Sequence, residues 1–134
     1  MPTKKVRPDV PKFIYWAPRV GAILFLIFLA MFSLDIFEGG YGFWGTVVGL
    51  FMHNIPVMIL TIVLAISWRL EYIGGVVFIL AGLLYTAVVW KTAIMHPLDR
   101  VVYSGILLIA CPALAIGILF WINWFRKSKT KIND

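Results

Sequence analysis

The residues best suited to chemistry lie together in one long apolar stretch. His53 and Asn54 fall near its middle, and Thr46 and Thr61 flank them. At 100° per residue these side chains and that of Ser67 occupy an arc of about 140° on a helix, so one face is polar. An imidazole can take up or release a proton, and a carboxamide can both donate and accept hydrogen bonds. We therefore expect this face to point into the protein and to form a candidate intramembrane polar site.

Pro56 adds a third polar group to this region. Proline has no backbone N–H, so the carbonyl of Met52 should lose its helical partner beside His53 and Asn54. The three groups together could hold a water, a proton or a small polar solute. Pro112 should release the carbonyl of Leu108 in the same way. Proline breaks at matching positions in two halves of a chain can mark a transport site, although membrane helices also tolerate proline for structural reasons.

His53 also has a structural interpretation. Polar side chains in the middle of a membrane helix hydrogen-bond to neighbouring helices and hold a bundle together. A buried ionisable group at that depth is a functional hypothesis by default. Because the sequence places only one ionisable residue there, it favours the structural role and leaves the functional one open.

Asp35 lies at the outer end of the first span and could reach inward to a polar partner on the second, so it is counted with the candidate polar site. With Glu38, His96 and Asp99 it belongs to a set that could attract a cation, but the spacing matches no metal motif. We therefore expect solvated charges and no metal. The chain shows no nucleophile paired with a base, no phosphate-binding loop and no cofactor motif, so we expect no cofactor and no enzymatic activity.

The elements that position these residues follow from composition. Of 134 residues, 62% are hydrophobic and 13% charged, and the mean hydropathy is +0.95. A soluble domain of this size needs more polar surface, so the bilayer is the expected solvent. Stretches of roughly 20 apolar residues are long enough to span it. Four are found, at about 17–37, 44–67, 73–90 and 101–125, with tails at 1–16 and 126–134.

Orientation follows from the positive charges. Ten of the 12 Lys and Arg residues fall on the side of the two termini, which predicts that both termini are cytoplasmic and that the cell membrane is the location. The basic tails should contact anionic lipid, and no nucleic-acid motif accompanies them. Short connections make successive helices antiparallel. The prediction is an all-α polytopic membrane protein, a single four-helix antiparallel transmembrane bundle over residues 1–134.

Several local features are also predicted. Pro18 suits the first turn of the first span. Arg69 and Glu71 could pair in the tight turn at 68–72, and the segment from Ser128 onward should be irregular. Because Gly74 and Gly75 weaken an isolated helix, the third span is the least secure.

The interfacial motifs resemble those of a group of small uncharacterised prokaryotic four-span membrane proteins. The matching residues are Trp16-Ala17-Pro18-Arg19, Asp35-Ile36-Phe37, Gly42-Phe43-Trp44, and Trp68-Arg69-Leu70-Glu71 with Gly74-Gly75. That resemblance implies no activity. The chain also has the size of the small multidrug exporters, but it lacks an acidic residue inside its first span and so departs from that family.

Two functions follow from these observations. The first is a non-enzymatic accessory or structural membrane protein, acting as a homo-oligomer or within a larger membrane complex. The alternative is a small oligomeric transporter or channel that uses the polar site around His53 and Asn54.

Overall fold

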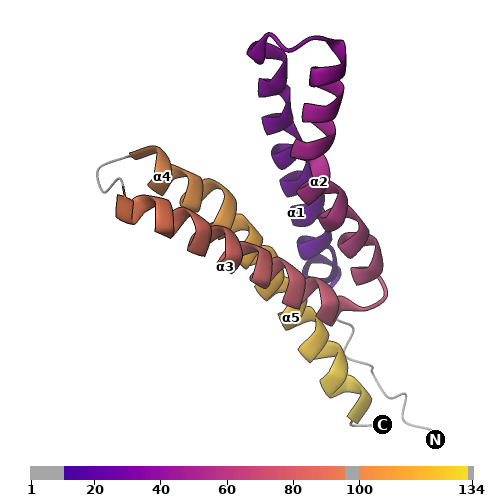
Figure 1. Cartoon of the computed structure of the whole chain (residues 1–134). Coiled ribbons are helices and arrows are strands. Elements are labelled where there is room, and N and C mark those ends of the chain that lie inside the picture. The colour runs from indigo at the N-terminus through magenta and orange to yellow at the C-terminus, as the bar shows by residue number, and fades with distance from the viewer. Residues whose placement is uncertain (1–10, 96–99, 133–134) are drawn as a thin grey trace, which may run out of the picture.

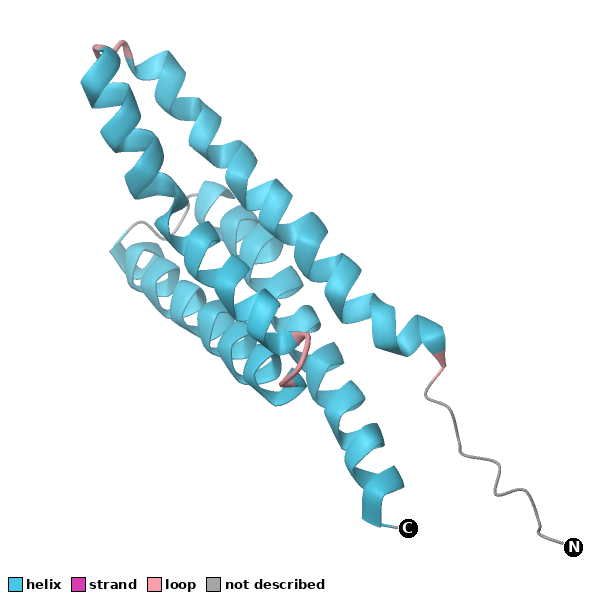
Figure 2. Cartoon of the chain, turned by 90° about the vertical axis from the view of Figure 1, so that its right-hand side faces the viewer, coloured by secondary structure: helices cyan, strands magenta, loops and turns pink. Residues whose placement is uncertain are grey.

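The protein is a chain of long helices, described by a computed structural model over residues 11–95 and 100–132 (Figures 1 and 2). The first span is the helix α1 (Lys12–Met31), extended by the 3₁₀ helix η1 (Phe32–Gly39), and α2 (Phe43–Ser67) and α3 (Glu71–Met95) follow. The last span joins α4 (Arg100–Gly105), the π-helix η2 (Ile106–Ala110) and α5 (Cys111–Ile132). Within the described residues, these four helical stretches are long and apolar enough to cross a membrane.

The spans form two antiparallel hairpins that meet at one end and diverge at the other. One arm contains α1 and α2, and the other contains α3, α4 and α5 (Figure 1). We call the end where α1 begins, α2 turns into α3 and α5 finishes the closed end. The opposite end, with the α1–α2 connection, is the open end. The predicted bundle is therefore present, but its two halves pack together over only part of their length.

The core lies toward the closed end, because there all four spans contribute apolar side chains. Phe78 of α3 stacks on Phe120 of α5, with ring centroids 6.1 Å apart. Ala22 and Phe25 of α1, together with Leu64 of α2, complete the centre of this cluster. Burying such side chains is what joins the two arms.

Glycine allows the backbones of α3 and α5 to approach closely. A Cβ added at Gly117 would lie 2.9 Å from the backbone nitrogen of Ile79 and 3.0 Å from the carbonyl oxygen of Gly75. A Cβ at Gly75 would overlap the Trp121 ring. The glycines that weaken the third span as an isolated helix thus let it pack against the fourth, which is their usual role between membrane helices. This span runs to Met95 and equals α2 in length.

Two boundary predictions need correction. The first helix begins at Lys12, so Pro18 lies inside α1 rather than in its first turn. The segment 126–132, predicted to be a tail that becomes irregular at Ser128, is the last part of α5. The apolar windows missed both extensions because polar and basic residues continue a helix beyond the hydrocarbon as readily as apolar ones do.

Candidate functional site

The polar residues of α2 bond mainly to their own helix. His53 Nδ1 lies 3.2 Å from the carbonyl oxygen of Gly49, and Asn54 Nδ2 donates to the carbonyl of Leu50 at 2.9 Å. The Thr61 hydroxyl donates to the Val57 carbonyl at 2.7 Å. Each side chain bonds to the carbonyl one turn earlier, which is a common arrangement for polar residues in membrane helices.

The polar face of α2 is buried only in part, whereas the sequence-based expectation placed all of it inside the bundle. His53 and Thr61 are exposed, whereas Asn54 and Thr46 are half-buried. Thr46 donates to the Tyr41 carbonyl at 3.1 Å, which links the start of α2 to the preceding connection. On the same side of α2, the second half of the helix buries Leu60, Leu64 and Ser67. His53 is exposed because the first half of α2 lies where the two arms diverge (Figure 1).

A hollow of about 590 Å³ lies beside His53 in the first half of α2. The ring of Tyr41 and the side chain of Ile36 approach α2 closely here, where Gly45 and Gly49 leave room for them. The hollow is lined by Ile36, Tyr41, Gly45, Val48, Gly49, Met52, His53 and Pro56. His53 thus borders an apolar depression on the surface of the arm.

The cluster of an imidazole, a carboxamide and a free carbonyl that the sequence predicted beside Pro56 does not form. The imidazole and carboxamide bond to Gly49 and Leu50, not to the Met52 carbonyl that Pro56 deprives of its N–H partner. In the fourth span the π-helix η2 ends two residues before Pro112, and the N–H of Cys111 bonds to the Ile106 carbonyl five residues earlier. A widened turn before proline is one way in which a helix re-forms its hydrogen bonds.

Asp35 lies apart from the other candidate residues. It is exposed on η1 at the open end, as is Glu38. His96 and Asp99, which the sequence grouped with them, lie outside the described residues. No group of three metal-ligating side chains occurs in the part of the chain that the structure describes.

The most concentrated polar cluster lies at the closed end and was not predicted. Arg19 Nη2 and Lys127 Nζ each lie 2.7 Å from the same atom, Glu71 Oε1. Arg19 is fully buried and Glu71 is 4% exposed, whereas Lys127 is 45% exposed. One carboxylate oxygen therefore joins α1, α3 and α5.

Tyr15 and Asn123 complete this closed-end cluster. The Arg19 guanidinium donates to the Tyr15 carbonyl and lies 3.6 Å from the centroid of the Tyr15 ring. Lys127 Nζ lies 4.8 Å from the same centroid. Asn123, fully buried, donates to the Tyr15 carbonyl at 3.4 Å, and its Oδ1 has no partner among the described residues. A buried arginine with a carboxylate and a facing ring is a typical way to hold a charge in a dry site.

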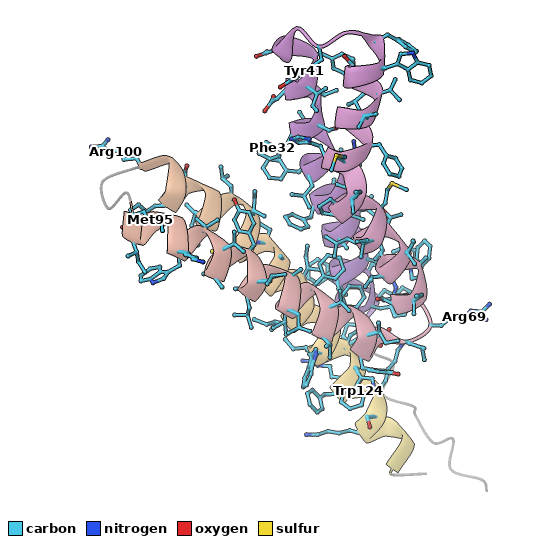
Figure 3. All side chains as sticks on the ribbon, viewed as in Figure 1. Phe32, Tyr41, Arg69, Met95, Arg100 and Trp124 are labelled. Atoms are coloured by element: carbon cyan, nitrogen blue, oxygen red, sulfur yellow. The ribbon has the colours of Figure 1, made fainter. Side chains whose placement is uncertain are left out.

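The predicted ion pair between Arg69 and Glu71 is wrong. Glu71 turns inward to Arg19, while Arg69 projects from the turn away from the helices (Figure 3).

A signal for the closed-end cluster was present in the sequence. Glu71 is the one acidic residue between 39 and 98, and Arg19 and Asn123 stand inside apolar runs near the same predicted end of the bundle. A polar residue in such a position needs a partner, and Glu71, the one acidic residue in the turn at that end, was the natural candidate.

These features define a small multi-pass helical membrane protein whose spans are held together at one end by a buried ion-pair cluster. Over residues 7–133 the chain matches the family described as "Domain of unknown function (DUF7670)", and it belongs to that family. No curated protein and no solved structure matches it significantly.

Proposed function

We propose that this protein is a non-enzymatic accessory or structural component of the cell membrane, with both termini cytoplasmic, and that it self-associates through the polar face of α2. The single observation that supports the proposal is the position of His53, exposed on the outer surface of α2. His53 lies ten residues into the helix, or about 15 Å along it. That depth is close to the middle of the hydrocarbon layer.

An exposed imidazole at this depth needs a polar partner that lipid cannot supply. The Gly49 carbonyl can only accept, so Nδ1 of a neutral ring carries the hydrogen and Nε2 remains an acceptor. The His53 imidazole therefore uses one of its two nitrogens for a hydrogen bond, and the other is without one within the described residues. A second helix that brings a donor to Nε2 would satisfy it.

A second copy of the chain supplies such a donor at the right depth. A two-fold axis along the membrane normal keeps every residue at its own depth in both copies. His53 of one copy then lies at the same depth as His53 and Asn54 of the other copy. Asn54 uses one amide hydrogen for the Leu50 carbonyl and has a second one to donate. The exposed Thr61, two turns further along α2, extends the same surface toward the closed end.

The test of this proposal is the monomer–dimer equilibrium of the full chain in mild detergent, followed by analytical ultracentrifugation. His53→Leu should shift the equilibrium toward the monomer by about threefold to thirtyfold, since interhelical hydrogen bonds in membranes contribute roughly 0.6–2 kcal/mol. Phe51→Leu, an exposed position 200° away on the same helix, is the matched control and should leave the equilibrium unchanged. A wild-type protein that stays monomeric, and that captures no partner in native membranes, would refute the role.

The hollow beside His53 favours a second candidate function. A transporter or channel would use His53 Nε2 and the adjacent 590 Å³ depression as a solute site completed by the second copy. Under this alternative, His53→Ala abolishes solute or proton flux in proteoliposomes while the chain remains folded. Unchanged flux removes His53 from any transport mechanism and leaves the structural role.

A further inference from the structure

A polar hollow of about 360 Å³ lies at the closed end, where the α2–α3 turn meets α5. Its lining is Arg69, Leu70, Glu71, Tyr72, Trp124, Lys127 and Ser128. The other hollows described along the arms are lined almost entirely by apolar side chains. This one combines cations, a hydroxyl and two aromatic rings, so its chemistry differs from that of a lipid-tail groove.

The charge of the hollow is positive. Glu71 contributes one negative charge, and Arg19 and Lys127 share a single oxygen of it at 2.7 Å. Arg69 is exposed and has no counter-ion among the described residues. Three cations thus stand against one carboxylate, and Lys127 keeps two hydrogens for another acceptor. An anion placed between Arg69 and Lys127 would offset the excess charge.

Backbone groups point to the same ligand class. The hollow includes the first two residues of the 25-residue helix α3. The N–H groups of a first helical turn have no partners within the helix and carry partial positive charge, so they favour an anion nearby. Ser128, half-buried on α5, adds a hydroxyl donor on the opposite wall.

The aromatic side chains indicate that the anion belongs to a lipid. Tyr72 and Trp124 line the hollow with ring centroids 6.4 Å apart, and Trp121 lies 6.2 Å from Trp124. Tyrosine and tryptophan gather at the level of the lipid headgroups. The hollow therefore lies where phospholipid phosphates lie, beside the groups that bind them. Figure 3 shows Arg69 at the rim of the turn, from which its long side chain can fold over a bound headgroup.

We infer that this hollow binds the phosphate of one anionic phospholipid, with Lys127 and Ser128 as the inner donors and Arg69 as the outer one. The inference narrows the expected contact of the basic tails with anionic lipid to one discrete site. It requires that the chain lies in a membrane but does not depend on self-association through α2.

Native mass spectrometry of the detergent-solubilised full chain with added phosphatidylglycerol tests the site. The wild type should retain one phosphatidylglycerol more tightly than phosphatidylcholine. Arg69→Gln should weaken that binding about fivefold, which corresponds to roughly 1 kcal/mol for a basic residue near anionic lipid. Lys127→Gln should weaken it at least as much. Because Lys127 also contacts Glu71, Arg69→Gln is the variant that tests binding without disturbing the cluster.

Lys129→Gln is the matched control. Lys129 is exposed on α5 two residues beyond Lys127 and does not line the hollow. Removing its charge should change phosphatidylglycerol binding by less than about twofold. Equal losses for Lys129→Gln and Arg69→Gln would overturn the discrete site in favour of diffuse attraction.

Inorganic phosphate tests whether the hollow binds the phosphate of a phospholipid or a free phosphate ion. Millimolar phosphate should neither displace the bound phosphatidylglycerol nor raise the melting temperature of the protein, because it lacks the acyl chains that hold a lipid at the interface. The lipid assignment would be contradicted if phosphate raised the melting temperature of the wild type but not of Arg69→Gln, and if phosphatidylglycerol raised neither.

Discussion

Arg19 Nη2 and Glu71 Oε1 lie 2.7 Å apart and join the two arms of the protein at the end where they meet. Both side chains are buried, and 52 positions separate them in the chain. Arg19 stands near the start of the first arm and Glu71 begins the second. This pair therefore fixes how the first hairpin docks on the second.

Removing either partner of this ion pair should strongly destabilise the protein. Glu71→Gln leaves the buried Arg19 charge uncompensated, and Arg19→Gln leaves the buried Glu71 with the half-exposed Lys127 as its remaining counter-ion. The expected loss is about 3–5 kcal/mol of unfolding free energy for Glu71→Gln and about 2–4 kcal/mol for Arg19→Gln. Lys127→Gln, at a half-exposed position, should cost less than about 1 kcal/mol. Reversible unfolding in mixed micelles with increasing dodecyl sulfate measures all three. A loss below 1 kcal/mol for Arg19→Gln would show that the pair does not join the arms.

Asn123 should be replaceable by an apolar residue. Its carboxamide is fully buried, makes one long hydrogen bond to the Tyr15 carbonyl and leaves Oδ1 without a partner. Asn123→Leu removes the unsatisfied group and keeps the volume, so stability should stay the same or rise by about 1 kcal/mol. The same unfolding assay measures it. A clear loss of stability would mean that Oδ1 has a partner in the membrane, such as an ordered water.

The contact between α3 and α5 should be sensitive to added volume at Gly117. Because the neighbouring atoms include the backbone of Ile79 and Gly75, they cannot move aside cheaply, and Gly117→Ala should cost about 1–3 kcal/mol. Gly21→Ala is the control. A Cβ there meets only Ile116 at 3.5 Å, so the better helix propensity of alanine should leave stability equal or higher.

The proposed orientation makes a prediction about fusion proteins. A green fluorescent protein fused after residue 134 should fluoresce, because both termini are expected in the cytoplasm. Alkaline phosphatase fused after Gly40, in the connection between η1 and α2, should be active. The reverse pattern would exclude the inward termini and would place the lipid hollow on the outer leaflet.

The sequence predicted the helices well, because a membrane span is a property of a local run of residues. The turn between Ser67 and Glu71 coincides with the tight turn expected at 68–72, and α2 begins at Phe43, one residue before the expected start of the second span. The ends of α1 and α5 were misjudged, since nothing local in a basic amphipathic segment marks where a helix leaves the hydrocarbon.

The arrangement of side chains between helices was harder to predict. The period of α2 correctly places His53 and Thr61 on one side, but it cannot tell whether that side meets a neighbouring helix or faces outward. Leu60 and Leu64 lie on that same side and are buried, whereas His53 is exposed because the arms diverge beside the first half of α2 (Figure 1). In the same way, the preference of Glu71 for Arg19 over Arg69 depends on docking of the two arms, and no spacing in the sequence encodes it.

Disulfide cross-linking in native membranes tests self-association through α2 most directly. Thr61→Cys in a Cys111→Ala background keeps His53 and Asn54 and places a thiol on the polar face. Ile59→Cys, exposed at nearly the same depth but about 200° around the helix, is the control. We predict that oxidation converts most of the Thr61→Cys protein to a covalent dimer and leaves the Ile59→Cys protein monomeric. Monomer from both variants, or equal dimer from both, would contradict an interface on the polar face of α2.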